Sequence, residues 1–295
     1  MARTAVITDS NAMITGEEAR ELGIYLVPMP FMIGTDTATY YEGINLSREE
    51  FFAKLEGEDQ IVTSQPVPTD VLRVWDEALK TYDEVVYIPM SSGLSGSCQS
   101  AMMLSDDYDG KVQVVDNQRI SVTMKASVLD AIELAKRGMS AARIREILEK
   151  VKFDSSIYIM LDTLKYLKRG GRITPAAAAI GSLLRIKPVL QIKGERLDAF
   201  SKARTVAQGK NTMITAMKND IEKLYGGLSA DSVWLYAVHA NVPEEQAVWV
   251  KEVEAAFPGI PVIPDQLSLS VCCHIGPGAL AIACSKKLDY DELCR

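Results

Sequence analysis

Residues 84–97 read Glu-Val-Val-Tyr-Ile-Pro-Met-Ser-Ser-Gly-Leu-Ser-Gly-Ser, and this stretch decides the fold class. The β-branched apolar run from Val85 to Pro89 predicts a buried strand, and the serine- and glycine-rich segment Met90–Ser97 follows it directly. From Ser97 to about Leu104 the apolar residues have helical spacing. A strand, a glycine-rich turn and a helix in this order are typical of α/β proteins, which bind ligands at the carboxyl ends of parallel strands.

The same alternation of strands and helices is predicted along the first half of the chain. Two further candidate strands are Thr4–Thr8 and Val112–Asp116. Apolar residues at helical spacing mark the segments that start near Thr69, Ser121 and Ala141. Because crossover helices cover both faces of a parallel sheet, we expect an N-terminal α/β domain with a mainly parallel sheet and helices on both faces.

A second domain of mixed α/β structure is expected after residue 153. The segment Lys152-Phe153-Asp154 follows the last helix of the first half, and a new strand begins at Ser156. Beyond that strand, helices and strands alternate without clear repetition. We therefore predict two domains, 1–153 and 154–295, with a cleft between them of the kind that commonly holds ligands.

Composition excludes several classes of function. The 295-residue chain carries 39 acidic and 32 basic residues, so its net charge of -7 argues against broad binding to nucleic acid or to an anionic membrane. The start, MARTAVITDS, lacks the signature of a signal peptide, and the uncharged stretch near residues 173–184 is too short to span a bilayer. We expect a soluble, cytoplasmic protein with no nucleic-acid partner and no stable membrane insertion.

Cysteine and histidine are scarce. The five cysteines show no CxxC spacing, and without a secretion signal they are interpreted as reduced thiols. The two histidines, His239 and His274, lie far apart and show no HExxH spacing. A structural or catalytic metal is therefore not expected, although Asp and Glu could in principle bind a hard cation.

The segment Met90–Ser97 is the first candidate site. Several serine hydroxyls and two glycines stand at the start of a helix, where O–H and N–H donors attract an anion. The alternative is an ordinary serine-rich turn in which Ser97 caps the helix. A second polar loop, Thr63-Ser64-Gln65-Pro66, precedes another helix and also offers hydroxyls, although it could equally be an extended connector.

His274 is the candidate histidine. It opens the segment His274-Ile-Gly-Pro-Gly278, whose glycines allow close approach, at the mouth of an apolar strand. His239 ends an apolar strand and is interpreted as a satisfied or solvent-facing residue. A nucleophilic Ser95 paired with His274 is an alternative, but the chain has no GxSxG elbow and no identifiable acidic orienting residue.

A basic cluster stands out in this acidic protein. It comprises Lys165-Tyr-Leu-Lys-Arg-Gly-Gly-Arg172, followed by Arg185 and Lys187. The default interpretation is a solvated helix end. The functional alternative is an anion site, or a docking face for an acidic or phosphate-bearing partner.

Taken in order, these motifs resemble the DegV family, the bacterial fatty acid-binding group that includes the binding subunits of fatty acid kinase. The resemblance covers almost the full length of the chain. Each motif is weak alone, whereas their order and spacing together are specific. The matching segments are Ile7-Thr-Asp-Ser10, Thr63-Ser-Gln-Pro66, Ser91-Ser-Gly-Leu-Ser-Gly96, Val115-Asp-Asn117, Leu164 through Arg172, and His274-Ile-Gly-Pro-Gly278.

The resemblance implies a two-domain DegV-like fold with one long-chain fatty acid in an apolar tunnel between the domains. The carboxylate would be held by Thr63 and by Ser95, which we choose among three serines, with the backbone N–H of Gly96 and the imidazole of His274 completing the site. Arg172 matches the motif arginine, with a role near the headgroup or at a partner interface. The runs Ile24–Ile33 and Pro175–Leu184 are candidate tunnel walls, although core packing explains them equally well.

The resemblance also implies a carrier that is not catalytic alone. A separate ATP-dependent fatty acid kinase subunit would phosphorylate the bound carboxylate, and no cofactor other than the fatty acid ligand is expected. The main alternative is a stand-alone acyl-ester hydrolase or acyl-transferring enzyme that uses Ser95 and His274. A third alternative is a binding module for another carboxylate.

Overall fold

The computed structural model describes residues 2–57, 59–171, 186–194, 197–225 and 229–294. The chain divides into two compact units: Met1–Lys152 with Leu288–Arg295, and Phe153–Lys287. The first unit ends at Lys152 and the second begins at Phe153, whereas the sequence analysis divided the chain after residue 153. Leu288–Arg295, which that analysis assigned to the second domain, belongs to the first unit.

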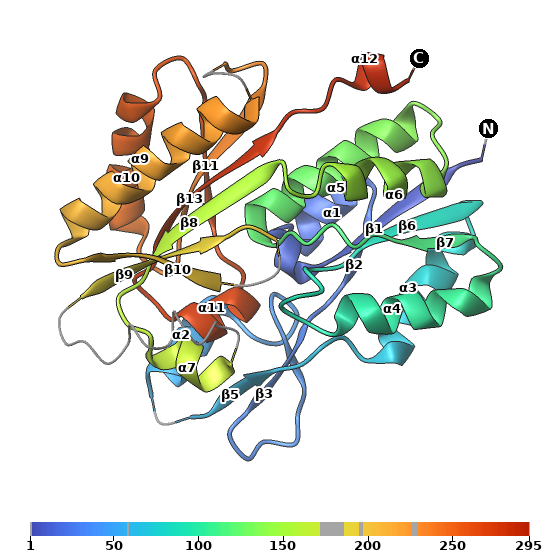
Figure 1. Ribbon diagram of the computed structural model, residues 1–295. Coiled ribbons are helices and arrows are strands. Elements are labelled where there is room, and N and C mark those ends of the chain that lie inside the picture. The colour runs from blue at the N-terminus through green and yellow to red at the C-terminus, as the bar shows by residue number, and fades with distance from the viewer. Residues whose placement is uncertain (1, 58, 172–185, 195–196, 226–228, 295) are drawn as a thin grey trace. The chain divides into compact units, whose positions relative to one another are not determined.

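A parallel sheet forms the centre of the first unit (Figure 1). Its strands lie in the order β2-β1-β6-β7, and each neighbouring pair is parallel. The strands are β1 (Thr4–Asp9), β2 (Tyr25–Val27), β6 (Glu84–Ile88) and β7 (Val112–Val114). The expected parallel sheet is confirmed, and its strands are the short apolar runs that the sequence marks.

Helices cover both faces of this sheet. Side chains alternate along β6, so Tyr87 faces one layer of helices, where its ring lies 5.6 Å from that of Trp75, while Ile88 faces the other. The first layer consists of α3 (Pro68–Leu79) and α4 (Ser97–Ser105), and the second of α5 (Ser121–Lys136) and α6 (Ala141–Lys150). Burial on both faces explains why the strands read as continuous apolar runs.

A small antiparallel sheet belongs to the same unit and was not predicted. Its order is β4-β3-β5, with strands β3 (Pro30–Ile33), β4 (Tyr40–Tyr41) and β5 (Ile61–Thr63). Two further helices belong to this unit. They are α1 (Gly16–Leu22), which precedes β2, and α2 (Arg48–Glu56), which precedes β5, and both begin at a capping box. The strands are too short for a period of two to stand out in the sequence.

The C-terminal segment is attached to the first unit through α5. Tyr290, at the start of α12 (Tyr290–Leu293), donates its hydroxyl to Asp130 over 2.7 Å. Arg137 pairs with Asp291 at 2.6 Å and lies 5.3 Å from the centre of the Tyr290 ring. These contacts explain why the end of the chain packs with residues far before it in sequence.

The second unit contains a mixed sheet in the order β10-β9-β8-β13-β11-β12. Only β11 and β12 pair in parallel among these neighbours, and the other pairs are antiparallel. The strands are β8 (Ser155–Met160), β9 (Lys187–Ile192), β10 (Leu197–Ala203), β11 (Val233–His239), β12 (Val262–Gln266) and β13 (Leu280–Lys286). The expected mixed α/β architecture is confirmed.

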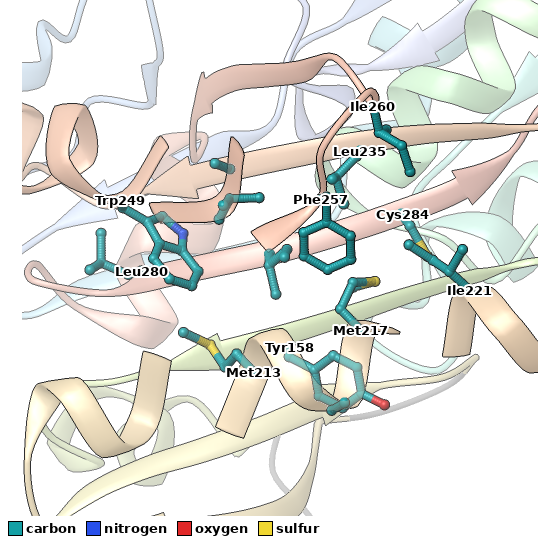
Figure 2. Close-up of a cluster of buried hydrophobic side chains, with 14 of the residues drawn as sticks. Tyr158, Met213, Met217, Ile221, Leu235, Trp249, Phe257, Ile260, Leu280 and Cys284 are labelled. Atoms are coloured by element: carbon teal, nitrogen blue, oxygen red, sulfur yellow. The ribbon is translucent and has the colours of Figure 1, made fainter. Parts of the chain in front are cut away.

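Two helices, α9 (Val206–Tyr225) and α10 (Pro243–Ala256), cover one face of this mixed sheet (Figure 1). Figure 2 shows the core that they bury, in which Met213 and Met217 of α9 and Trp249 of α10 point toward the strands. Trp249 donates its indole N–H to the carbonyl of Ala281 over 2.8 Å. The polar end of this large side chain is therefore satisfied inside the core.

Two short helices also lie in the described part of the second unit. They are α7 (Lys165–Gly170) and α11 (Leu269–Ile275), and they pack against each other. The candidate tunnel wall Pro175–Leu184 lies outside the described residues.

Candidate functional site

The parallel sheet of the first unit has a topological switch point between β1 and β6. From β1 the chain passes to β2 on one side, and it later returns to β6 on the other side. The loops that follow β1 and β6 therefore leave the sheet in opposite directions, and ligands of open α/β sheets commonly bind at such a point. The segments at this edge are Asp9–Asn11 and Met90–Gly96.

Asp9 ties these two strand ends together. Its fully buried carboxylate accepts hydrogen bonds from the backbone N–H of Met90 and that of Asn11, both at 2.8 Å, and from the Asn11 side chain at 2.9 Å. Burial raises the pKa of Asp9 to about 6, although these hydrogen bonds act in the opposite direction. The motif Ile7-Thr-Asp-Ser10 thus contributes a residue that positions the loop after β6.

Ser95 and Gly96 lie between that loop and α4. The backbone N–H groups of Leu94 and Ser95 donate to the carbonyl of Ser91, at 3.0 and 3.1 Å, which closes a turn. The hydroxyl of Ser95 accepts the N–H of Ser97 at 3.2 Å. Because accepting uses only a lone pair, the Ser95 hydroxyl keeps its proton for donation to a ligand.

The alternative in which Ser97 caps α4 is wrong. Ser97 is the first residue of the helix, and Gly96 occupies the cap position. The Ser97 hydroxyl is buried and has no hydrogen-bond partner within the part of the chain that the structure describes. The capping oxygen that reaches the first turn belongs to Ser95 instead.

Thr63 is held by the small sheet. It is the last residue of β5 and pairs with Phe31 of β3, and the next backbone N–H, that of Ser64, donates to the carbonyl of Pro30 at 3.3 Å. The expected polar loop therefore begins one residue later than predicted. The half-buried Thr63 is fixed by strand pairing.

Gln65 brings the Thr63 loop to the Ser95 loop. Its side-chain Oε1 accepts the hydroxyl of Ser100 on α4 at 3.2 Å. A Cβ atom at Gly96 would lie only 3.0 Å from the same oxygen, so glycine allows this close approach. The structure thus joins two of the predicted motifs through a residue to which sequence reasoning assigned no role.

His274 belongs to the second unit and lies in the last turn of α11. Sequence analysis placed it at the mouth of a strand, but α11 intervenes, and β13 begins only after Gly278. A Cβ atom at Gly170 of α7 would lie 2.1 Å from His274 Nδ1. This glycine therefore allows the half-buried imidazole to pack directly against the backbone of α7.

The basic cluster is described only in part. Lys165, Lys168 and Arg169 are exposed on α7, which is the solvated helix end of the default interpretation. Lys187 forms an ion pair with Asp162 at 2.6 Å. Arg172 lies outside the described residues, so its predicted role stays a prediction.

The other candidate side chains are His239 and the five cysteines. His239 is buried and its Nδ1 accepts the N–H of Val242 at 3.0 Å, so it is a satisfied residue. The cysteines carry free thiols, and burial raises the pKa of Cys98 to about 12. Searching the described chain finds no group of His, Cys, Asp or Glu suited to a metal ion. None of its described helices has both the length and the apolar character needed to cross a bilayer.

A parallel-sheet unit with serine- and glycine-rich segments at the carboxyl ends of its strands, followed by a mixed-sheet unit, defines a class of two-unit α/β proteins. The chain belongs to the DegV family, whose sequence profile, described as that of an uncharacterised protein, matches residues 3–287. A DegV domain-containing protein of Listeria innocua is 31% identical over 288 residues, which cover 97% of this chain and 99% of the relative.

Solved structures agree with this assignment. A DegV family protein from Thermus thermophilus, described by its fatty acid binding, superposes with a TM-score of 0.86 at 30% identity, covering 97% of this chain and 100% of that one. DegV of Bacillus subtilis, described as a fatty acid-binding protein, superposes with a TM-score of 0.84 at 30% identity and the same coverage. The DegV fold is therefore shown over nearly the whole chain.

Proposed function

We propose that this protein binds one long-chain fatty acid and presents its carboxylate to a separate ATP-dependent fatty acid kinase subunit. The observation that carries the proposal is the match, over 97% of the chain, to two solved family members that are described as binding fatty acids. In this proposal the protein is a cytoplasmic carrier that needs no cofactor and is not catalytic alone.

The acyl chain supplies most of the affinity in this proposal. Burying methylene groups gains about 0.8 kcal/mol each, so a dozen contribute on the order of 10 kcal/mol before the costs of ordering. We place the tail in an apolar tunnel between the two units, now proposed as the two domains. In the run Ile24–Ile33, the side chains of Val27, Met29 and Phe31 are buried and apolar.

The headgroup sets the orientation of the ligand. Removing a carboxylate from water costs several kcal/mol unless its oxygens receive hydrogen bonds. The proposed donors are the hydroxyls of Thr63 and Ser95, the backbone N–H of Gly96, and the imidazole of His274. Strand pairing and the Ser91 turn hold Thr63 and Ser95 in place before a ligand arrives, which lowers the entropic cost of binding. Arg172 remains a proposed headgroup or partner contact.

Denaturing extraction followed by mass spectrometry tests the proposal most directly. We expect the purified protein to release close to one equivalent of a long-chain fatty acid, or to take one up after delipidation. A protein that carries none and binds none when it is added would contradict the carrier function. Release of free fatty acid from an added acyl ester by the protein alone would favour the hydrolase instead.

The headgroup site is tested by the double variant Thr63→Ala/Ser95→Ala. Since two hydrogen bonds to a charged group are lost, we expect fatty acid affinity to fall by roughly a hundredfold or more. Formation of acyl phosphate with a cognate kinase should fall in parallel. Affinity and acyl-phosphate formation that both match the wild type would show that other loops hold the carboxylate.

A further inference from the structure

We propose that the second unit carries a binding site for a neutral oligosaccharide, in the groove between β10 and α9. The fatty acid proposal does not use this groove, so the two can be tested separately. The lining residues on which the inference depends are one phenylalanine of β10 and a polar stripe of α9: Phe200, Gln208, Asn211, Thr212, Thr215 and Asn219.

The groove lies at one edge of the mixed sheet, because β10 is the outermost strand beside β9. Its cavity volume is about 530 Å³, which is within the usual range for small-molecule sites. The polar stripe runs from Gln208 to Asn219, a rise of about 16 Å along the helix. This length suits a short chain of linked units better than a single ring.

Phe200 provides the aromatic surface of the groove. The pairing of β10 with β9 shifts between Ala199 and Ser201, so Phe200 is the extra residue of a β-bulge. Its ring lies 4.8 Å from the ring of Tyr158, yet 41% of the residue stays exposed. Phe200 therefore rests on a second aromatic ring and still presents a flat apolar surface to a ligand.

The ring beneath Phe200 is fixed by hydrogen bonds. The hydroxyls of Tyr158 and Ser156 both donate to the same carboxylate oxygen of Asp220 on α9, each at 2.7 Å. Lys193 pairs with the other oxygen of Asp220 at 2.8 Å. The Tyr158 ring is therefore held in place before a ligand arrives, and such preorganisation lowers the cost of binding.

The facing stripe of α9 offers hydrogen-bonding groups without charge. The side chains of Asn211, Thr215 and Asn219 are exposed and form no hydrogen bond with the residues that the structure describes. Each amide supplies N–H donors and an acceptor, and each hydroxyl both donates and accepts. None of the six lining residues named above is charged, although charged residues make up 24% of the chain.

These features together indicate the class of ligand. A charged ligand would find no opposite charge among these side chains to offset the water it loses. A peptide that added to β10 as a further strand would meet the bulge at Phe200, which interrupts the regular edge. A sugar chain carries hydroxyls that both donate and accept, and the C–H groups on the face of a sugar ring pack against the electron-rich face of an aromatic ring. The groove therefore matches a neutral oligosaccharide.

The test measures binding of maltotriose, cellotriose and triacetylchitotriose to the purified protein by isothermal titration calorimetry. The variants are Phe200→Ala, Phe200→Trp and the double variant Asn211→Ala/Asn219→Ala. The matched control is Phe153→Ala, which removes another exposed phenylalanine of the second unit. Thermal unfolding and fatty acid content are recorded for every protein.

We expect at least one of the three oligosaccharides to bind the wild type with a dissociation constant of about 1 mM or tighter. Phe200→Ala and the double asparagine variant should each weaken that binding roughly tenfold, because one loses the stacking surface and the other loses two hydrogen-bonding amides. Phe200→Trp keeps an aromatic face and should bind as tightly as the wild type. Phe153→Ala should also bind as the wild type does, and the fatty acid content of every variant should be unchanged.

Three results would overturn the inference. A wild type that binds none of the three oligosaccharides would do so and would leave the fatty acid proposal standing. Binding that Phe200→Ala does not weaken would show that the sugar lies elsewhere. A Phe200→Trp protein that binds as weakly as Phe200→Ala, while unfolding at the temperature of the wild type, would show that stacking on an aromatic ring is not the source of the affinity.

Discussion

At the scale of single residues, the first unit contains a buried carboxylate that has no part in the proposed headgroup site. Asp130 lies on α5 with an exposed fraction of 1%. Burial raises its pKa to about 6, although the hydrogen bond from Tyr290 and the charge of Arg119 act to lower it. Because the folded protein holds this proton more tightly than the unfolded chain, the group favours folding below about pH 4. That contribution is lost as the pH rises to about 6.

We predict that Asp130→Asn stabilises the protein relative to the wild type, and that this gain is larger at pH 7 than at pH 4. The amide keeps an oxygen that can accept from Tyr290 and removes the buried negative charge, so the gain at pH 7 should reach up to about 3 kcal/mol. Urea unfolding at the two pH values measures it. The exposed Asp107→Asn is the control, and an equal effect of Asp130→Asn at both pH values would contradict the prediction.

Residue identity in the candidate site was only partly predictable from the sequence. Thr63, Ser95 and Gly96 were named from their motifs, and the structure brings their loops together. Gln65 was missed because its contact with Ser100 spans 35 residues and leaves no local pattern. The pairing of Asp9 with Met90, 81 residues away, was missed for the same reason.

At the scale of elements, α7 and α11 meet without space for a side chain between them. Gly170 is the residue of α7 at the contact, and His274 is its counterpart on α11. The Arg-Gly-Gly-Arg motif and the histidine motif are therefore linked by packing. The orientation of the imidazole depends on a glycine about a hundred residues earlier in the chain.

We predict that Gly170→Ala destabilises the second unit by about 1–3 kcal/mol, the usual cost of overpacking. The new methyl group would lie 2.1 Å from His274 Nδ1, so the two helices must move apart. Urea unfolding measures the loss. Gly16→Ala is the control, because a Cβ atom there meets nothing within 4 Å, and a Gly170→Ala midpoint as high as that of the control would contradict the prediction.

Elements with strong periodicity were predicted closely, and short ones were not. The helix expected to start near Ser121 begins at that residue in the structure. The short strands β2, β4 and β5 give no readable alternation. The short helix α11 was not predicted, since a brief apolar run does not distinguish a helix from a strand.

At the scale of the whole molecule, the C-terminal segment does not belong to the unit that precedes it in the sequence. Leu288–Arg295 belongs to the first unit although it follows the second unit in sequence. The ion pair of Arg137 with Asp291 and the hydrogen bond of Tyr290 to Asp130 join residues about 150 positions apart. Dividing the chain at a single position therefore assigns these C-terminal residues to the wrong unit.

The sequence by itself determined the parallel α/β character of the first unit, the mixed character of the second and the segments that carry the polar motifs. These follow from periodicity and turn composition, which act over a few neighbouring residues. Only the tertiary structure decided that Gln65 lies against Gly96 and that His274 packs on Gly170. Such contacts depend on how distant elements pack, because burial and hydrogen bonding are satisfied by partners that lie close in space and not in sequence.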